Sequence, residues 1–440
     1  MPESCAVTLV RAIGRWSMAA LVINSIIGSG IFGLPSDLAK LLGNASPYAV
    51  LIAGGAMGVI MACFAEVASR FTQTGGPYLY SRVAFGRLVG IEMGWMLWLV
   101  RLTAPAANAS LFVIYLREFW PRAMDPFPRL CVLTLLIGIL AVTNLRGVRA
   151  GAEMSNIFTV AKLVPLFLVA IAGAVYVSNH QQMSNATATS AGAHSWLKAI
   201  LILGFAYGGF EGALTPMSEA TNPRRDTTFG LFAALITCTA LYTVIQWVVV
   251  KVLADPAHSE RPLAEVARLA MGNSGAALIA VGALVSIYGY LSANMLAVPR
   301  LTFALAEQQD FPAIFAAVHP RFRTPYFSII VFAALVWLFA LLGNFTWNVT
   351  LSAAARLFCY GAGCAALPVL RRKQPGGARF QLPAGSLLAL IGVTVCVVLI
   401  TQIDLRKSLI LVAVIITAFL NWMAVRNRES QQTTTQISLE

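Results

Sequence analysis

A few charged residues stand inside long apolar stretches of the sequence, where the cost of burying a charge marks each one as a functional candidate. They are Glu66, Glu92, Arg101, Lys162, Glu211 and Arg356. Lys162 lies deep in its stretch, within FTVAKLVPLF. Because burial disfavours a charged ammonium, Lys162 could exchange a proton or serve as a fixed cation. A structural ion pair, or the capping of backbone carbonyls, is the alternative.

Both arginines remain charged in any protein environment, so neither can carry a proton and each needs an anion or a dipole. Structural pairing, for example with Glu211, and contact with an anionic substrate group are both open for Arg101 and Arg356. Glu211 follows two glycines, so we expect it to stabilise that segment by accepting hydrogen bonds from free amides. Glu66 and Glu92 lie toward the ends of their stretches and are interpreted as structural. Their charges are expected to meet Arg70, Arg82 or Arg87, or else water.

Two glycine clusters interrupt apolar stretches near their middles. Gly28, Ser29 and Gly30 lie within IIGSGIF, and Gly208 and Gly209 lie within GFAYGGFEG. Glycine pairs weaken helical continuity and free backbone groups, which is tolerated at membrane depth only where those groups line a cavity or meet a ligand. Close helix packing is the alternative for either cluster alone. The clusters fall in the first and sixth apolar stretches, as expected for five helices repeated in inverted topology around a ligand.

The composition places these stretches in a membrane. Of 440 residues, 58% are hydrophobic and 11% are charged, whereas soluble domains are about 25% charged. Because lipid cannot satisfy open backbone groups and the apolar runs do not alternate, the predicted fold class is an all-α integral membrane bundle. Spans of about 20 residues predict about twelve transmembrane helices and no large soluble domain.

The expected spans follow from the apolar runs between charges and Gly/Pro punctuation. The first six are 13–39, 47–70, 88–117, 129–146, 154–178 and 196–218, and the second six are 228–254, 275–306, 327–343, 347–370, 384–403 and 407–426. The chain is interpreted as one membrane domain, 1–440, with a five-helix repeat at 13–178, an inverted repeat at 196–370, two further helices at 384–426 and a short cytoplasmic tail at 427–440.

Charge and cysteine usage agree with this organisation. The net charge is +13, and the positive residues lie in short loops. Their distribution predicts a multi-pass protein of the cell membrane with both termini cytoplasmic. It gives no reason to expect a nucleic acid partner. Seven cysteines fall mostly in apolar runs, and four histidines fall in loops or at helix ends. Neither set predicts a disulfide, a metal site or a buried proton relay.

Four motifs carry a resemblance to a known family. They are IIGSGIFGLP at 26–35, GGPYLYSRVAFGRLVGIEMGW at 75–95, GFAYGGFEG continuing to SEATNPRR at 204–225, and SANMLAVPRLTFALAEQQDFPAIFAAVHPRFRTP at 292–325. In order and spacing they resemble the amino acid-polyamine-organocation superfamily of secondary transporters. The resemblance implies a LeuT-like fold of ten core helices in two inverted repeats plus two more, with the substrate held between the interruptions.

The same resemblance implies a site. The glycine-serine stretch would receive a substrate carboxylate, unwound carbonyls would receive its amino group, and Phe205 matches an aromatic gate. These contacts fall on Ile27, Gly28, Ser29, Gly30, Phe205, Ala206, Tyr207, Gly208 and Gly209. Lys162 matches a lysine that stands in place of a sodium ion in proton-linked and exchanger members. The resemblance therefore argues against sodium coupling and leaves proton symport and exchange open.

Two departures from the family are visible. Thr228 stands where the family has a proline after NPxR, which touches only a loop. The loop between the third and fourth spans has no cysteine, so no disulfide-linked heavy chain is expected.

The sequence thus predicts a secondary active permease for amino acids or related amines, working by alternating access and coupled to protons. Neutral cargo is favoured, because no carboxylate at a span centre clearly awaits a cationic side chain. An exchanger, or a carrier of acidic or cationic amino acids or polyamines, is the alternative, with Arg101 or Arg356 receiving an acidic side chain. A non-transporting receptor is disfavoured by the short tail. No nucleophile, base and metal constellation, catalytic residue or cofactor of an enzyme is predicted.

Overall fold

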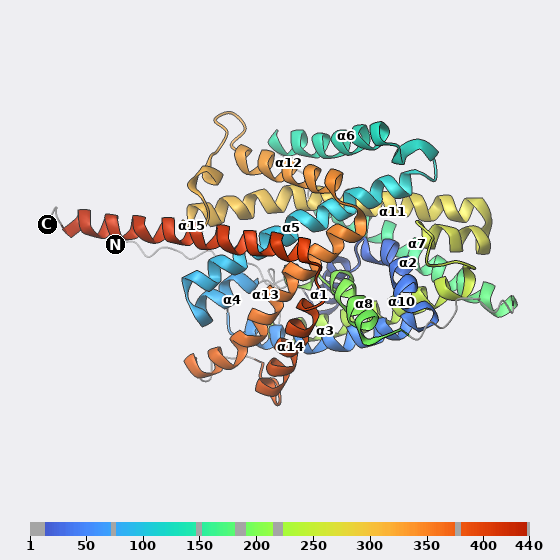
Figure 1. Ribbon diagram of the computed structural model, residues 1–440, viewed down its shortest axis with the longest axis horizontal. Coiled ribbons are helices and arrows are strands. Elements are labelled where there is room, and N and C mark those ends of the chain that lie inside the picture. Colours follow the sequence, from blue (N-terminus) through green and yellow to red (C-terminus); the bar gives the residue numbers. More distant parts are fainter. Residues whose placement is uncertain are drawn as a thin grey trace.

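The computed structural model describes residues 14–71, 76–146, 152–180, 191–213, 223–374 and 380–437. The regular structure of these ranges is helical and contains no strand (Figure 1). The α-helices are α1 (Arg15–Ile26), α2 (Gly30–Leu42), α3 (Ser46–Ser69), α4 (Gly76–Phe85), α5 (Arg87–Leu116), α6 (Pro126–Leu145), α7 (Ala152–Asn179), α8 (Ala193–Ala206), α9 (Phe210–Ala213), α10 (Pro223–Val252), α11 (Pro262–Glu307), α12 (Tyr326–Leu342), α13 (Phe345–Lys373), α14 (Gly385–Ile400) and α15 (Leu405–Ile437).

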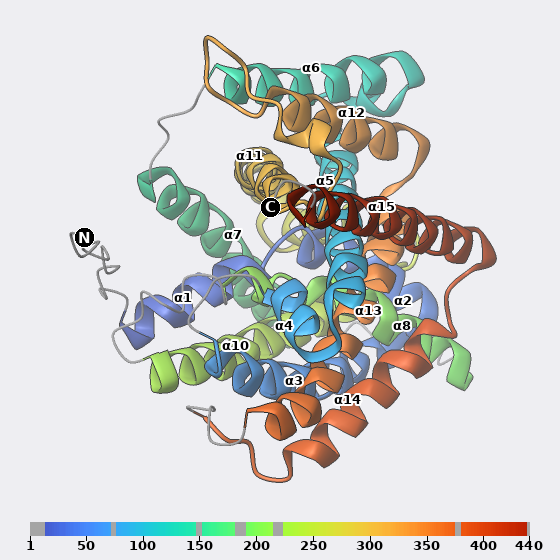
Figure 2. The same ribbon diagram turned by 90° about the vertical axis from the view of Figure 1, so that its left-hand side faces the viewer.

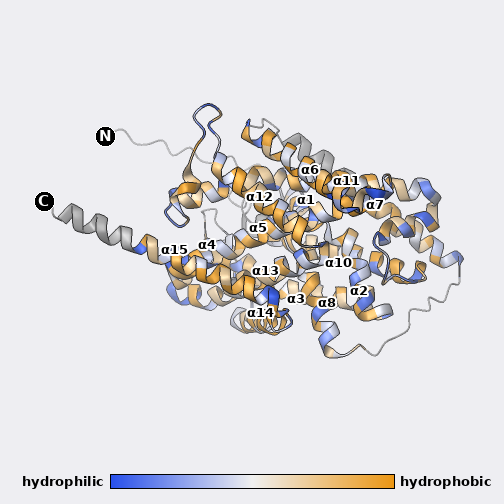
Figure 3. Cartoon of the chain, turned by 45° about the horizontal axis from the view of Figure 1, so that its top comes forward, coloured by the Kyte–Doolittle hydropathy of each residue, from blue (hydrophilic) through white to orange (hydrophobic). Residues whose placement is uncertain are grey.

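The helices have the length and surface of membrane-spanning elements. Eight stretches of the described chain are long and apolar enough to cross a membrane, and the shorter helices α8, α12 and α14 are also apolar. Apolar residues run along the helices, whereas hydrophilic residues gather at helix ends and loops (Figure 3). Large apolar side chains such as Phe127 of α6, Ile171 of α7 and Leu409 of α15 are exposed, as expected for a face in contact with lipid. The all-α integral membrane class is therefore confirmed.

Both predicted interruptions are present. α1 ends at Ile26 and α2 begins at Gly30, and α8 ends at Ala206 and α9 begins at Phe210. The packing alternative also holds in part, because a Cβ on Gly30 would lie 3.0 Å from the Ala206 Cα. The glycines thus serve two purposes, since they end the helices and bring the two ends together.

Several helix limits differ from the sequence prediction. α4 is a separate helix between the second and third expected spans. α11 begins at Pro262, earlier than the expected residue 275, and bends at Gly272, whose φ of 76° suits glycine. α15 continues to Ile437, so much of the expected tail at 427–440 is helical. Part of the expected span at 196–218 lies outside the described residues.

The arrangement places α5 and α13 side by side at the centre of the bundle (Figure 2). α1 packs against α10 and α9, and α11 packs against α7 and α5. α6 and α12 pair at one side, while α14 lies against α13 and α3. The two interrupted helices are therefore surrounded by α3, α5, α10, α11 and α13.

Candidate functional site

The first turn of α2 presents unpaired amides. The amides of Phe32 and Gly33 donate to the Ser29 carbonyl at 3.1 Å each. The hydrogen bonds of the described residues leave the amides of Ser29, Gly30 and Ile31 without an acceptor. The Ser29 hydroxyl, on a residue only 2% exposed, has no partner either. A helix N-terminus with free donors is the positive end of the helix dipole and suits an anionic group.

The second interruption is held open by Gly209. Its φ is 111°, a conformation that other residues rarely adopt. A Cβ at this position would overlap the Ser25 carbonyl oxygen of α1. The Gly209 amide donates to Glu211 Oε2 at 2.9 Å, so the carboxylate satisfies a donor that the interrupted helix leaves free.

A tyrosine of α10 bridges the ends of α1 and α8. The Tyr242 hydroxyl lies 3.3 Å from the Ile26 carbonyl and 3.2 Å from the Ala206 carbonyl. These carbonyls belong to the negative ends of the two helices. Sequence reasoning missed Tyr242, because a tyrosine in the apolar run TALYTVIQWVVV is typical of ordinary packing.

Lys162 caps the end of α1. Its Nζ donates to the Asn24 carbonyl at 2.6 Å and to the Ile27 carbonyl at 2.7 Å, and the residue is 7% exposed. Within the described residues Lys162 forms no ion pair, so the geometry matches the carbonyl-capping interpretation. A cation at a helix C-terminus is stabilised by the helix dipole. The sequence placed Lys162 in the membrane but did not identify these carbonyls as its partners.

A buried ion pair lies next to the second interruption. Arg356 Nη1 donates to Glu211 Oε1 at 2.9 Å, and the Tyr360 hydroxyl donates to Glu211 Oε2 at 3.0 Å. Arg356 is 4% exposed and Glu211 is 3% exposed. A Cβ on Gly208 would overlap the Arg356 guanidinium, so the guanidinium lies directly against this glycine. Arg356 therefore ties α13 to the broken helix through a charge pair and through close packing.

Of the three remaining charged residues in apolar stretches, Glu66 forms ion pairs with other described residues, whereas Glu92 and Arg101 do not. Glu66 binds Arg70 at 2.9 Å and Arg371 at 2.6 Å, which agrees with a structural role. Glu92 and Arg101 form no ion pair within the part of the chain that the structure describes. The pairing of Glu92 with a nearby arginine that the sequence suggested is therefore absent from this structure.

The expected partners of Glu92 bind elsewhere. Arg82 Nη1 and Arg87 Nε donate to the Asp310 carboxylate at 2.7 and 2.9 Å, and the Tyr78 hydroxyl donates to the same fully buried group. The Asn421 side chain of α15 donates to the Asp310 carbonyl at 2.8 Å. Burial and the bond to Asp310 raise the pKa of Tyr78 to about 12. This Asp310 cluster joins α4, α5 and α15 to the segment after α11.

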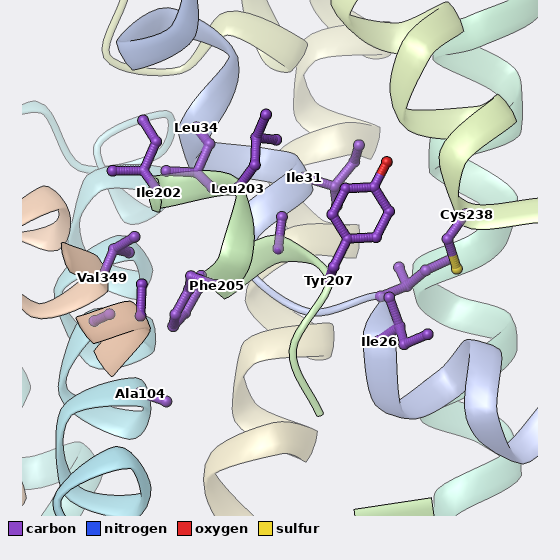
Figure 4. Close-up of a cluster of buried hydrophobic side chains, with 14 of the residues drawn as sticks. Ile26, Ile31, Leu34, Ala104, Ile202, Leu203, Phe205, Tyr207, Cys238 and Val349 are labelled. Atoms are coloured by element: carbon purple, nitrogen blue, oxygen red, sulfur yellow. The ribbon is translucent and has the colours of Figure 1, made fainter. Parts of the chain in front are cut away.

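The two aromatic residues at the second interruption face different neighbours. Phe205 lies on the side of Ala104 of α5 and Val349 of α13, whereas Tyr207 lies on the opposite side (Figure 4). The Tyr207 hydroxyl donates to the Val50 carbonyl of α3 at 2.9 Å. Phe205 therefore faces the centre of the bundle, and Tyr207 packs between α8 and α3.

The donor set of the described residues holds no group of three His, Cys, Asp or Glu side chains that could bind a metal ion. The interrupted segments instead bring together positive amides at the start of α2 and negative carbonyls at the ends of α1 and α8. Such an arrangement binds charged groups through hydrogen bonds.

The chain is similar to known transport proteins. The profile of the family described as "Amino acid permease" matches residues 13–427. The chain is 26% identical over 415 residues to the methylthioribose transporter of Bacillus subtilis (strain 168), covering 90% of this chain and 88% of that protein. It is 27% identical over 443 residues to the branched-chain amino acid permease of the same organism, covering 95% and 92% of the two chains. The serine/threonine exchanger of that organism is 28% identical over 348 residues, covering 76% and 78%.

The family profile and the first two relatives span nearly the whole chain. They confirm a multi-pass membrane transporter rather than an enzyme. The chain belongs to the amino acid permease family of the amino acid-polyamine-organocation superfamily.

Proposed function

We propose that this chain carries amino acids across the cell membrane by alternating access. The observation that carries the proposal is the meeting of unpaired α2 amides with the carbonyl ends of α1 and α8. A zwitterion would place its carboxylate against Gly28, Ser29 and Gly30 and its ammonium near the Ala206 carbonyl, because the Ile27 carbonyl already accepts a hydrogen bond from Lys162. The names of two relatives, a branched-chain amino acid permease and a serine/threonine exchanger, support amino acid cargo.

The proposed architecture is a LeuT-like pair of inverted five-helix repeats at 13–178 and 196–370, followed by two helices. Twelve crossings would leave both termini in the cytoplasm. The interruptions in the first and sixth expected spans support this repeat. The loop arginines near 70–87 and 371–379 support the orientation, because positive loops stay cytoplasmic.

The cargo is expected to lack a positive side chain. Glu211, the carboxylate nearest the second interruption, already accepts hydrogen bonds from Arg356, Tyr360 and the Gly209 amide. Because Arg356 already neutralises it, Glu211 offers no free counter-charge to a cationic side chain. Neutral amino acids satisfy this condition.

Lys162 is the proposed coupling element. Its ammonium holds the Asn24 and Ile27 carbonyls in the manner of a bound cation, so sodium has no role at this position. Loss of the proton would release the end of α1 and allow that half-helix to move. Gain of the proton would restore it. Proton symport and exchange both follow from such a cycle.

The test is uptake by purified protein in liposomes. A full panel of labelled amino acids is offered with and without an inward pH gradient and with liposomes either empty or preloaded with the same amino acid. We expect gradient-driven uptake that falls at least tenfold in Lys162→Ala, whereas Lys40→Ala, an exposed lysine of α2, behaves as wild type.

Each outcome has a distinct meaning. If uptake is unchanged when the pH gradient is collapsed but requires preloaded amino acid, the mechanism is exchange and not proton symport. Binding without uptake under every condition would favour a receptor. A panel with neither binding nor uptake would refute amino acid transport.

A further inference from the structure

The charges around the second interruption do not cancel. Arg101 of α5 and Arg356 of α13 carry two positive charges, and Glu211 carries one negative charge, so these three residues together carry a net charge of +1, in addition to the Lys162 ammonium at the end of α1. Arg101 is close enough for its charge to act on Glu211 and on Tyr290 of α11. Yet Arg101 donates to no acceptor among the described residues.

Arg101 is also far from either end of its helix. It lies 14 residues after Arg87, which corresponds to roughly 21 Å along α5, and a similar distance before Leu116. A side chain cannot reach the lipid headgroups over that distance. Because a guanidinium stays charged, the molecule must supply an anion or water at this position.

Arg101 and the unpaired groups of α13 share the faces that surround Phe205. Arg101 precedes Ala104 by three residues, and Ser352 and Arg356 follow Val349 by three and seven, so each set lies on one helix face. Ala104 and Val349 belong to the same buried hydrophobic cluster as Phe205 (Figure 4), and α13 packs against both α5 and α8. The faces therefore meet next to the interruption in which the zwitterion is proposed to bind.

Two further donors at this meeting point lack partners. Arg356 Nε and Ser352 Oγ are buried without a hydrogen bond, on residues 4% and 0% exposed. Buried polar atoms in native proteins are nearly always satisfied, so unpaired donors in one place indicate a missing acceptor. Together with the guanidinium of Arg101, they match the oxygens of a carboxylate.

We propose that Arg101, with Arg356 Nε and Ser352 Oγ, binds the side-chain carboxylate of an acidic amino acid, so that the preferred cargo is aspartate or glutamate. This inference rests on the proposed amino acid transport and narrows its substrate class. The α-carboxylate meets the amides of α2, and the second carboxylate neutralises the excess positive charge. Neutral amino acids enter the same site but leave Arg101 without its anion.

The experiment compares labelled L-aspartate, L-glutamate, L-serine and L-leucine in proteoliposomes. The proteins are wild type, Arg101→Gln, Arg101→Lys and a control, Arg122→Gln, at an exposed arginine between α5 and α6. Wild type should prefer an acidic cargo. The ratio of kcat/KM for the better acidic cargo to that for serine should fall at least tenfold in Arg101→Gln, recover in part in Arg101→Lys and stay unchanged in the control. Unlabelled aspartate should also inhibit wild-type uptake at lower concentration than unlabelled serine.

The competition experiment uses only wild-type protein. It therefore tests the inference even if the Arg101→Gln protein does not fold. Uptake of serine or leucine without uptake or inhibition by acidic amino acids would overturn this inference and leave the proposed function intact. Absence of uptake of every amino acid would overturn both. Neutral uptake that requires chloride and loses that requirement in Arg101→Gln would assign Arg101 to an inorganic anion instead, which also overturns the inference.

Discussion

Glu211→Gln should destabilise the protein through Arg356 rather than through its own lost bonds. Glutamine keeps the shape of the side chain and can still accept from the Gly209 amide, which lies 2.9 Å from Glu211 Oε2. The Arg356 guanidinium, however, would lose its counter-charge while remaining buried. Removing one member of a buried pair costs about 3–5 kcal/mol. For a chain of 440 residues this corresponds to a melting temperature lower by about 3–5 °C.

The double variant Glu211→Gln/Arg356→Met provides the decisive comparison. Replacing both charges by groups of similar volume is often neutral, so the double variant should regain at least half of the lost stability. Melting of detergent-purified protein, followed by tryptophan fluorescence or by size-exclusion after heating, measures all members of the cycle. Glu307→Gln, at an exposed glutamate, serves as control and should change stability by less than about 0.5 kcal/mol. The cycle also includes Arg356→Met alone. If the melting temperature of the double variant falls by the sum of the decreases in the two single variants, the charges are not coupled, which would refute this reasoning.

Two further predictions concern Tyr78 and Gly209. Tyr78→Phe should destabilise by about 1.5–3 kcal/mol, the value of a hydrogen bond to a charged group, here Asp310. Because the pKa of Tyr78 is raised to about 12, its stabilising effect is complete below pH 10 and declines as the pH rises toward 12. Melting curves of wild type and Tyr78→Phe at pH 7 and above pH 10 check the sign. A stability difference between the two proteins that grows with pH would contradict the prediction. Gly209→Ala should lower both yield and uptake, because the left-handed backbone costs about 1–2 kcal/mol and the new Cβ overlaps the Ser25 carbonyl. Gly204→Ala, with open space at its Cβ, should be harmless, and equal behaviour of the two variants would count against the interpretation.

The interruptions were predictable because they are local. A glycine cluster within an apolar run weakens the helix wherever the rest of the chain lies, so Gly28 and Gly208 marked both interruptions in advance. The apolar runs likewise predicted most of the helices. The early start of α11 was missed, because the bend at Gly272 separates its first turns from the apolar part and hides their helical pattern.

Partnerships across the bundle were not predictable. Lys162 meets the carbonyls of Asn24 and Ile27, which carry no side-chain signal in the sequence. Tyr242 bridges two carbonyls for the same reason and resembles a packing residue. Arg82 had a plausible acidic neighbour nearby in sequence, yet it binds a residue more than two hundred positions away.

The Asp310 cluster has a practical consequence for anyone shortening the chain. Asn421 anchors α15 to the Asp310 carbonyl, and Ala418 and Leu411 of the same helix are buried against α5 and its neighbours. A protein ending before Leu405 would expose the surface of α5 that α15 covers and would leave the Asp310 carbonyl without the Asn421 donor. Fusion tags and stop codons are therefore better placed after Ile437 than within α15.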